Sequence, residues 1–166
     1  MIQPDALRPT LSPSAQKVQD LLADIDPTLR VLEFIESTRT SQEAADRVGC
    51  TLGQIGKSLI FQGKASGKPY LIITSGSNRV DEKLVAQIVG EKIRRADPEF
   101  VRQVTGFAIG GIPPVGHEQE IECLMDQDLF QYQEIWGAAG TPNGVFAISP
   151  GLMQQITKAR VTQVAQ

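Results

Sequence analysis

Short apolar stretches alternate with turn residues along the whole chain, and this pattern predicts a mixture of helices and strands. Apolar residues at helical spacing between Ser12 and Asp26 predict a helix that ends near Pro27. The same spacing, with a capping residue before it or a glycine after it, predicts helices around residues 40–49, 80–89 and 97–104. A further helix is expected to begin at Ser149–Pro150.

The strands are indicated by alternating or continuous apolar residues between turn signals. Two such runs, 54–61 and 69–74, lie on either side of a turn at 64–68 and predict a β-hairpin. Residues 29–35 are apolar on both faces, which is typical of a buried strand. Further strands are predicted at residues 107–109, 121–125, 134–137, 145–148 and 161–164. Hairpins mixed with short helices predict an α+β domain with a mixed or largely antiparallel sheet.

Length and composition limit the organisation of the chain to one domain. The 166 residues, 41% hydrophobic and 21% charged, are enough for one packed core and exclude a disordered chain. We expect residues 1–28 to form a lead-in and a helix that packs on the domain of residues 29–166. Because no targeting or membrane-spanning segment is evident, we expect a cytoplasmic protein. Cys50 and Cys123 lack metal-ligand spacing, so no metal and no cofactor are predicted.

The net charge of −3 argues at first against a nucleic-acid partner. The charges are distributed unevenly, however. Residues 57–102 carry nine basic and five acidic side chains, whereas residues 103–157 carry six acidic and no basic ones. Two interpretations stay open, a chance distribution of solvated charges and a basic face formed by the middle third of the chain.

Lys57 and two glycine-rich turns are the residues most able to carry chemistry. Lys57 lies inside a segment otherwise built for the core, where it either reaches solvent at a sheet edge or binds a phosphate, a ribose hydroxyl or an ester carbonyl. Gly110–Gly111 and Ala139–Gly140 lack bulk, so their backbone N–H groups can approach a substrate and stabilise an oxyanion. Ordinary tight turns are the alternative for both.

Familiar catalytic motifs are missing: there is no phosphate-binding P-loop, no nucleophile elbow and no zinc-protease helix. The single histidine, His117, ends the Gly/Pro-rich loop that begins at Gly110. It is either a general base or a residue whose hydrogen bond fixes that loop.

Four segments, taken in order, resemble the YbaK/ProX-type aminoacyl-tRNA deacylase family, which is related to the editing domain of bacterial prolyl-tRNA synthetase. They are Ile55–Phe61, Gly76 with Arg79–Leu84, Gly110–His117 and Ala138–Phe146. The resemblance implies a compact fold around a curved mixed sheet. It also implies hydrolysis, in trans, of the ester that joins a wrong amino acid to the terminal adenosine of tRNA.

The resemblance assigns roles to individual residues. Lys57 corresponds to the functionally important lysine of the family. The implied substrate-binding residues come from the two loops: Gly110, Gly111, Ile112, Pro113, Pro114 and His117, and then Ala139, Gly140 and Thr141. Ala139 and Phe146 stand where the Cys-tRNA deacylase branch carries Ser and Asp.

Three functions follow as hypotheses. The first is a trans-editing hydrolase whose partner is mischarged tRNA, with an aminoacyl-tRNA synthetase as a possible second partner and no membrane association. The second is a non-catalytic module that binds the aminoacyl or nucleotide group, motivated by Ala139 and Phe146. The third, direct DNA binding, is disfavoured because no helix-turn-helix is evident and residues 103–157 are acidic.

Overall fold

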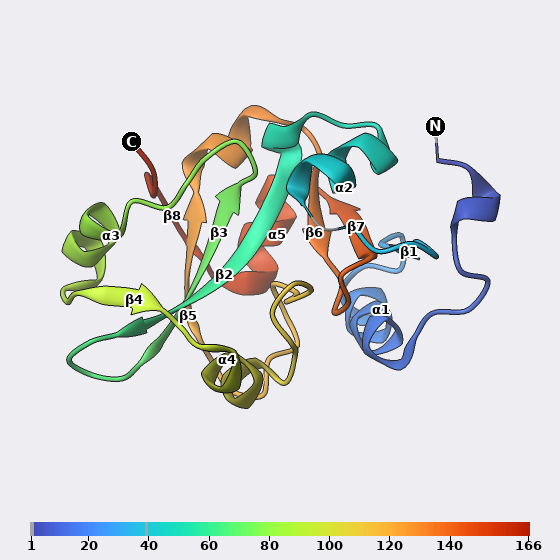
Figure 1. The fold of residues 1–166 in the computed structure, drawn as a ribbon. Coiled ribbons are helices and arrows are strands. Elements are labelled where there is room, and N and C mark those ends of the chain that lie inside the picture. Colours follow the sequence, from blue (N-terminus) through green and yellow to red (C-terminus); the bar gives the residue numbers. More distant parts are fainter. Residues whose placement is uncertain (1, 39) are drawn as a thin grey trace.

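One mixed sheet runs through the molecule (Figure 1), which is described here from a computed structural model covering residues 2–38 and 40–166. The strand order is β1-β7-β6-β2-β3-β5-β8, and β4 also pairs with β2. The parallel pairs are β2 with β6, β3 with β5, and β5 with β8, whereas the other pairs are antiparallel. The strands are β1 (Val31–Glu33), β2 (Ile55–Gly63), β3 (Pro69–Ser75), β4 (Ile93–Arg95), β5 (Glu122–Asp126), β6 (Ile135–Ala138), β7 (Gly144–Ile148) and β8 (Arg160–Thr162).

The helices begin and end at the residues that local chemistry dictates. The side chains of Thr40, Asp81, Asp97 and Ser149 each accept a hydrogen bond from a backbone N–H in the first turn of the following helix. The helices are α1 (Pro13–Ile25), α2 (Ser41–Val48), α3 (Glu82–Val89), α4 (Pro98–Thr105) and α5 (Pro150–Thr157). Short 3-10 helices lie at η1 (Pro4–Ala6), η2 (Leu52–Gln54) and η3 (Gln127–Gln131). The predicted mixed α/β fold is confirmed.

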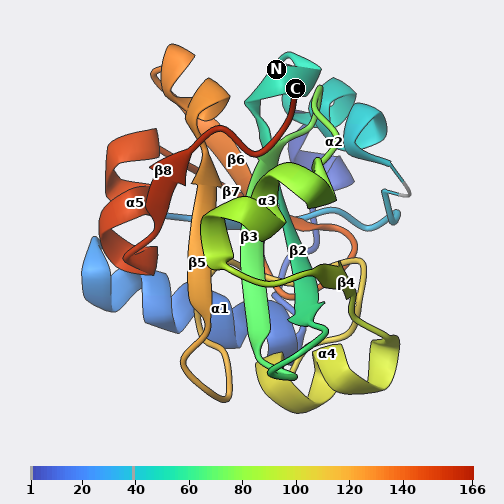
Figure 2. The same cartoon turned by 90° about the vertical axis from the view of Figure 1, so that its left-hand side faces the viewer.

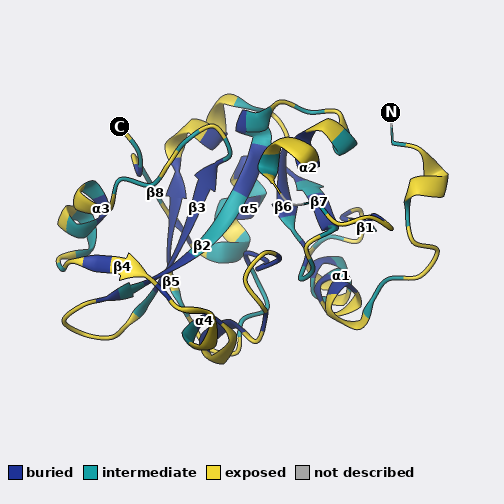
Figure 3. Ribbon diagram, viewed as in Figure 1, coloured by how far each residue is buried: buried dark blue, intermediate teal, exposed yellow. Residues whose placement is uncertain are grey.

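The sheet is covered on both faces, which explains why its central strands are apolar throughout. On β3, Leu71 and Ile73 face the core that includes α1, α4 and α5, whereas Tyr70 and Ile72 face the smaller cluster under α3 and β4. Figure 2 shows α3 in front of the sheet with α1 behind it, and Figure 3 shows the buried strands between exposed helix surfaces. A third cluster packs α2 against Trp136 and the start of β2.

One predicted strand is not formed, and one observed strand was not predicted. Residues 107–109, predicted as a strand, form a bend and turn instead. The Thr105 hydroxyl accepts a hydrogen bond from the Phe107 N–H (3.0 Å) and lies 3.2 Å from the Phe107 carbonyl, so the chain turns directly after α4. Strand β4 was not predicted, because its sequence Ile-Arg-Arg has no strand pattern of its own and the strand exists through pairing with β2.

Candidate active site

A cavity opens at a gap along one edge of β2. That edge pairs with β6 at Ile55–Gly56 and with β4 at Phe61–Gly63, and residues 57–60 between these pairings have no partner strand on that side. The cavity has a volume of about 330 Å³, within the roughly 300–1,000 Å³ typical of small-molecule sites. The interruption of the sheet therefore creates a space that can hold a small ligand.

The cavity walls come from the β2 edge, the start of α2 with the segment before it, β4, α4 with the loop that follows it, and β6 and β7 with the turn between them. Most of the surface is apolar, and no Asp, Glu, His or Cys is found among the described residues that line it. Both cysteines lie elsewhere. The side chains that matter below are Thr38, Lys57, Ser58, Arg95, Ile109, Ile112, Trp136 and Thr141.

The two glycine-rich loops contact each other through their backbones. The Gly140 N–H donates to the Gly111 carbonyl at 2.8 Å. A Cβ added to Gly111 would lie 2.5 Å from the carbonyl carbon of Thr141, so only glycine permits this approach. The Ala139 N–H donates to the Gly144 carbonyl at 3.0 Å, which closes the β6–β7 turn. The N–H groups of Ala139 and Gly140 are thus already used within the protein.

Free backbone donors are found in the loop that follows α4. Gly111 and Ile112 are buried and line the cavity, and within residues 2–38 and 40–166 neither backbone N–H has a hydrogen-bond acceptor. Buried N–H groups are almost always paired in folded proteins. These two N–H groups, on residues that line the cavity and without a protein acceptor, are therefore candidate donors to a ligand oxygen.

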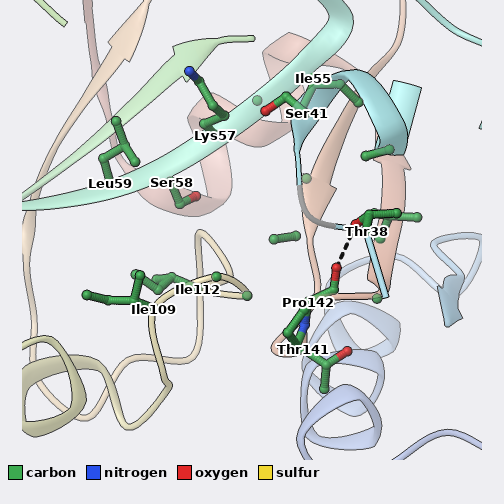
Figure 4. A pocket seen from close by; sticks show the side chains of 18 of the residues that line it. Thr38, Ser41, Ile55, Lys57, Ser58, Leu59, Ile109, Ile112, Thr141 and Pro142 are labelled. Atoms are coloured by element: carbon green, nitrogen blue, oxygen red, sulfur yellow. Dashed lines mark hydrogen bonds between the residues drawn. The ribbon is translucent and has the colours of Figure 1, made fainter. Parts of the chain in front are cut away.

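Lys57 and Ser58 leave β2 on opposite sides (Figure 4), with Ser58 on the side of Ile109 and Ile112. The Lys57 Nζ donates to the Asn78 carbonyl at 3.4 Å. Burial lowers the pKa of Lys57, and the positive charges of Arg95 and Arg79 lower that pKa further. Lys57 thus lines the cavity with its ammonium on the side of β2 away from Ile109 and Ile112, and we call this side the rim of the cavity.

The carbonyl that contacts Lys57 is held in place by a buried carboxylate. Asp126, only 1% exposed, accepts hydrogen bonds from the Ser75 N–H (2.9 Å), the Asn78 Nδ2 (2.9 Å) and the Thr74 hydroxyl (3.2 Å). Its other oxygen accepts from the Asp128 N–H at 3.0 Å. Asp126 thus fixes the loop after β3 and, through Asn78, the position of the Lys57 ammonium.

Ser58 supplies an unsatisfied polar atom to the cavity. Its Oγ is buried and is the one side-chain oxygen or nitrogen of that kind without a hydrogen-bond partner among the described residues. A buried hydroxyl left unpaired costs free energy, roughly 1–3 kcal/mol. A bound ligand with a donor or acceptor would remove that cost, so Ser58 is a candidate contact that the sequence analysis did not select.

The structure brings together half of the residues that the sequence nominated. Lys57, Gly110, Gly111, Ile112 and Thr141 line the cavity. Pro113, Pro114, His117, Ala139 and Gly140 do not. Ala139 and Phe146 are fully buried in the apolar core, so the two positions that depart from the Cys-tRNA deacylase pattern lie behind the cavity wall.

His117 lies on the far side of its loop, where it lines a separate surface hollow with Pro114. Its Nε2 is 2.7 Å from the Pro113 carbonyl. Burial lowers the pKa of His117, which favours a neutral ring whose Nε2–H donates to that carbonyl. This geometry matches a histidine that fixes the loop. His117 itself does not line the cavity.

Other lining residues come from the segment before α2, which carried no motif that sequence reasoning used. The Thr38 hydroxyl donates to the Pro142 carbonyl at 2.7 Å, and Thr40 and Ser41, the first residue of α2, also line the cavity. A cluster of hydroxyl residues immediately before a helix was the available signal. It predicted a helix cap, and nothing in it indicated which distant loop the hydroxyls would contact.

Glu33 connects the chain's N-terminal segment to the turn between β6 and β7. Its carboxylate is 2% exposed and accepts hydrogen bonds from the Ser12 N–H and hydroxyl, both at 2.7 Å, and from the Thr141 hydroxyl at 3.0 Å. Arg8 lies 3.7 Å away. Burial alone would raise the pKa of Glu33, but these hydrogen bonds outweigh burial and lower the pKa.

We expect Glu33→Ala to destabilise the protein by about 3 kcal/mol, because three donors lose their acceptor, and Glu33→Gln by about 1 kcal/mol. Since the pKa is lower in the folded state, the carboxylate stabilises the wild type above the unfolded value of about 4.3, and this contribution is lost as the pH falls through the folded pKa. Urea unfolding at several pH values measures both effects. Equal stability of Glu33→Ala and wild type at pH 7 would contradict the assigned role.

Two further searches bear on the class of protein. No helix in the described part of the chain is long and apolar enough to cross a membrane. Among the residues that the structure describes, no group of three or more His, Cys, Asp or Glu side chains is arranged to hold a metal ion.

The fold is a mixed sheet interrupted at β2, with a cavity beside two glycine loops that contact each other. The sequence profile of the aminoacyl-tRNA editing domain matches residues 35–156, and the chain belongs to this family. The Bacillus subtilis (strain 168) protein YwhH, whose function is uncharacterised, is 32% identical over 131 residues, which cover 79% of this chain and 83% of YwhH.

Two other comparisons extend the likeness. The proline–tRNA ligase of Limosilactobacillus fermentum is 29% identical over 126 residues, which cover 69% of this chain but only 22% of the ligase. A crystal structure of a candidate trans-editing enzyme for prolyl-tRNA synthetase superposes with a TM-score of 0.89 at 45% identity. That superposition covers 95% of this chain and 99% of the other.

Proposed function

We propose that the protein hydrolyses the ester bond of mischarged aminoacyl-tRNA and acts in trans. The observation that carries the proposal is the pair of unpaired N–H groups, on Gly111 and Ile112, at the wall of a cavity with the volume of a small ligand. Family membership and the likeness to a candidate trans-editing enzyme support it. The substrate is a mischarged tRNA whose aminoacyl group enters the cavity.

The proposed chemistry needs no group on the protein that exchanges protons. Water adds to the ester carbonyl carbon, the bond from that carbon to the ribose oxygen breaks, and the departing oxygen takes a proton. The N–H groups of Gly111 and Ile112 donate to the oxyanion as it forms. Because the lining residues that the structure describes include no Asp, Glu, His or Cys, the vicinal ribose hydroxyl is the group available to relay the proton, and positioning supplies much of the rate.

Lys57 contacts the nucleotide in this proposal rather than the carbonyl. Its ammonium lies at the rim of the cavity on the side of β2 opposite Ser58, as expected of a group that binds the sugar-phosphate part of the terminal adenosine. Ser58 Oγ, which has no partner in the protein, is available to the aminoacyl group inside the cavity. In this proposal Lys57 thus contacts the nucleotide, and its neighbour Ser58 contacts the aminoacyl group.

The test is a panel of tRNAs charged with different amino acids, with release of the amino acid as the readout. We expect turnover of at least one mischarged tRNA and little hydrolysis of tRNA that carries its correct amino acid. A Ser58→Ala variant should change the preference among amino acids, whereas Ser66→Ala, in the exposed β2–β3 turn, should not. Failure of the wild type to release any amino acid from the panel would overturn the hydrolase proposal.

A non-catalytic binding module is the second candidate, and one observation favours it. Ala139 and Phe146 place apolar side chains in the core where the Cys-tRNA deacylase branch carries Ser and Asp. A binding module would bind tRNA or an aminoacyl-adenosine analogue in a salt-sensitive manner without turnover. The same panel separates the two functions, because turnover that depends on Lys57 excludes a module that only binds.

A further inference from the structure

Three cationic side chains gather at the rim of the cavity, and two of them have no role in the mechanism above. Arg79 follows Asn78, whose carbonyl contacts the Lys57 ammonium. Arg95 lines the cavity from β4, in register with Phe61 on β2. Lys57 and Arg95 line the same cavity, and the positive charges of Arg95 and Arg79 both lower the pKa of Lys57.

These cations lack the acidic partners that surface arginines commonly have. Within residues 2–38 and 40–166, the ion pairs join Arg8, Lys17, Arg47 and Lys68 to glutamates, and none includes Lys57, Arg79 or Arg95. The carboxylates of Asp126 and Asp128 are close by, but both accept from the Asn78 amide, at 2.9 and 2.8 Å. The positive charges of Lys57, Arg79 and Arg95 are therefore available to a ligand.

The two arginines are also placed to receive a ligand from outside. Arg79 and Arg95 are both exposed. The Arg95 guanidinium lies over the Phe61 ring, 5.6 Å from its centre, which limits its motion while leaving its N–H groups free to donate. A planar fork held in this way suits a phosphate oxygen pair.

We propose that Arg79 and Arg95 bind backbone phosphates of the single-stranded tRNA end whose aminoacyl group occupies the cavity. The inference rests on the proposed function, because an amino acid in the cavity remains joined to RNA that must leave across this rim. Few exposed aromatic rings are available for stacking, since aromatic residues make up only 5% of the chain. Recognition of the RNA therefore depends on phosphate contacts, which are independent of base sequence.

The experiment measures how the affinity for uncharged tRNA depends on salt, by fluorescence anisotropy in a series of KCl concentrations. Each lost contact to a single-stranded phosphate should reduce the slope of log K against log salt by about 0.7. We expect this reduction for Arg79→Gln and for Arg95→Gln, and about twice as much for the double variant. Arg160→Gln removes an equally exposed arginine from β8 and should leave the slope unchanged.

The outcomes separate this inference from the proposed function. If the double variant keeps the wild-type slope, the phosphate contacts are refuted, whether or not the protein hydrolyses esters. If wild-type protein hydrolyses no substrate but the slopes fall as stated, the phosphate surface stands and only the hydrolase proposal fails. With an active enzyme, the double variant should lose more kcat/KM on aminoacyl-tRNA than on aminoacyl-adenosine, which has no phosphate. Equal losses on both substrates would overturn the inference.

Discussion

Replacing Lys57 by methionine is expected to lower kcat/KM for mischarged tRNA by roughly 10- to 100-fold, the loss of one charge-assisted contact. Methionine keeps most of the apolar stem of lysine, which is half-buried at the cavity rim, and removes only the ammonium. The free energy of unfolding should change by less than about 1 kcal/mol, because the ammonium makes a single long hydrogen bond to Asn78.

The matched control is Lys64→Met, which removes the same charge from the exposed β2–β3 turn. Single-turnover hydrolysis with enzyme in excess gives the rate for the bound substrate, and a titration of enzyme gives the affinity. If Lys57 contacts the nucleotide, affinity falls more than the rate of the bound complex. If Lys57→Met keeps the wild-type kcat/KM, Lys57 does not contact the substrate.

Gly111→Ala is expected to damage both activity and stability. The added methyl group would lie 2.5–2.8 Å from three backbone atoms of Thr141, so the two loops must move apart. Separation breaks the hydrogen bond from Gly140 to the Gly111 carbonyl and displaces the two unpaired N–H groups. We expect kcat to fall about 100-fold and stability to fall by about 2–4 kcal/mol.

Gly151→Ala provides the comparison, because a Cβ at this position in α5 meets no atom within 4 Å. Alanine there should keep full activity and raise stability slightly, since alanine is the better helix former. Both variants are measured by urea unfolding and by amino-acid release from mischarged tRNA. Full activity in Gly111→Ala would show that the contact between the loops does not position the catalytic donors.

The helices and the first hairpin could be predicted because their signals are local. Asp97 followed by proline, and Ser149 followed by proline, each begin a helix through contacts within four residues. Gly49 ends α2 in the left-handed conformation that glycine adopts most readily. Such features need no knowledge of the remaining fold, and the structure agrees with them closely.

Predictions were limited where pairing across the chain decides the outcome. Strand β4 exists because β2 offers it an edge, whereas residues 107–109 form a bend and turn because the Thr105 hydroxyl holds Phe107 directly after α4. The same limit applies to the prediction of the site. Glycine loops and a core lysine could be recognised from their own sequence, but the gap in the sheet that joins them to Thr38 and Ser58 depends on strand order.

The sheet's two halves are joined by very little backbone. One half is β1-β7-β6 and the other is β2-β3-β5-β8, and they meet at two residue pairs, Ile55 with Trp136 and Gly56 with Gly137. Both residues of the second pair are glycines, but Ile55 and Trp136 of the first pair belong to one buried cluster. The main core also crosses the junction, because Ile60 and Leu71 of one half lie in the same cluster as Ile135 and Phe146 of the other. Side-chain packing, much more than strand pairing, therefore holds the two halves of the sheet together beside the cavity.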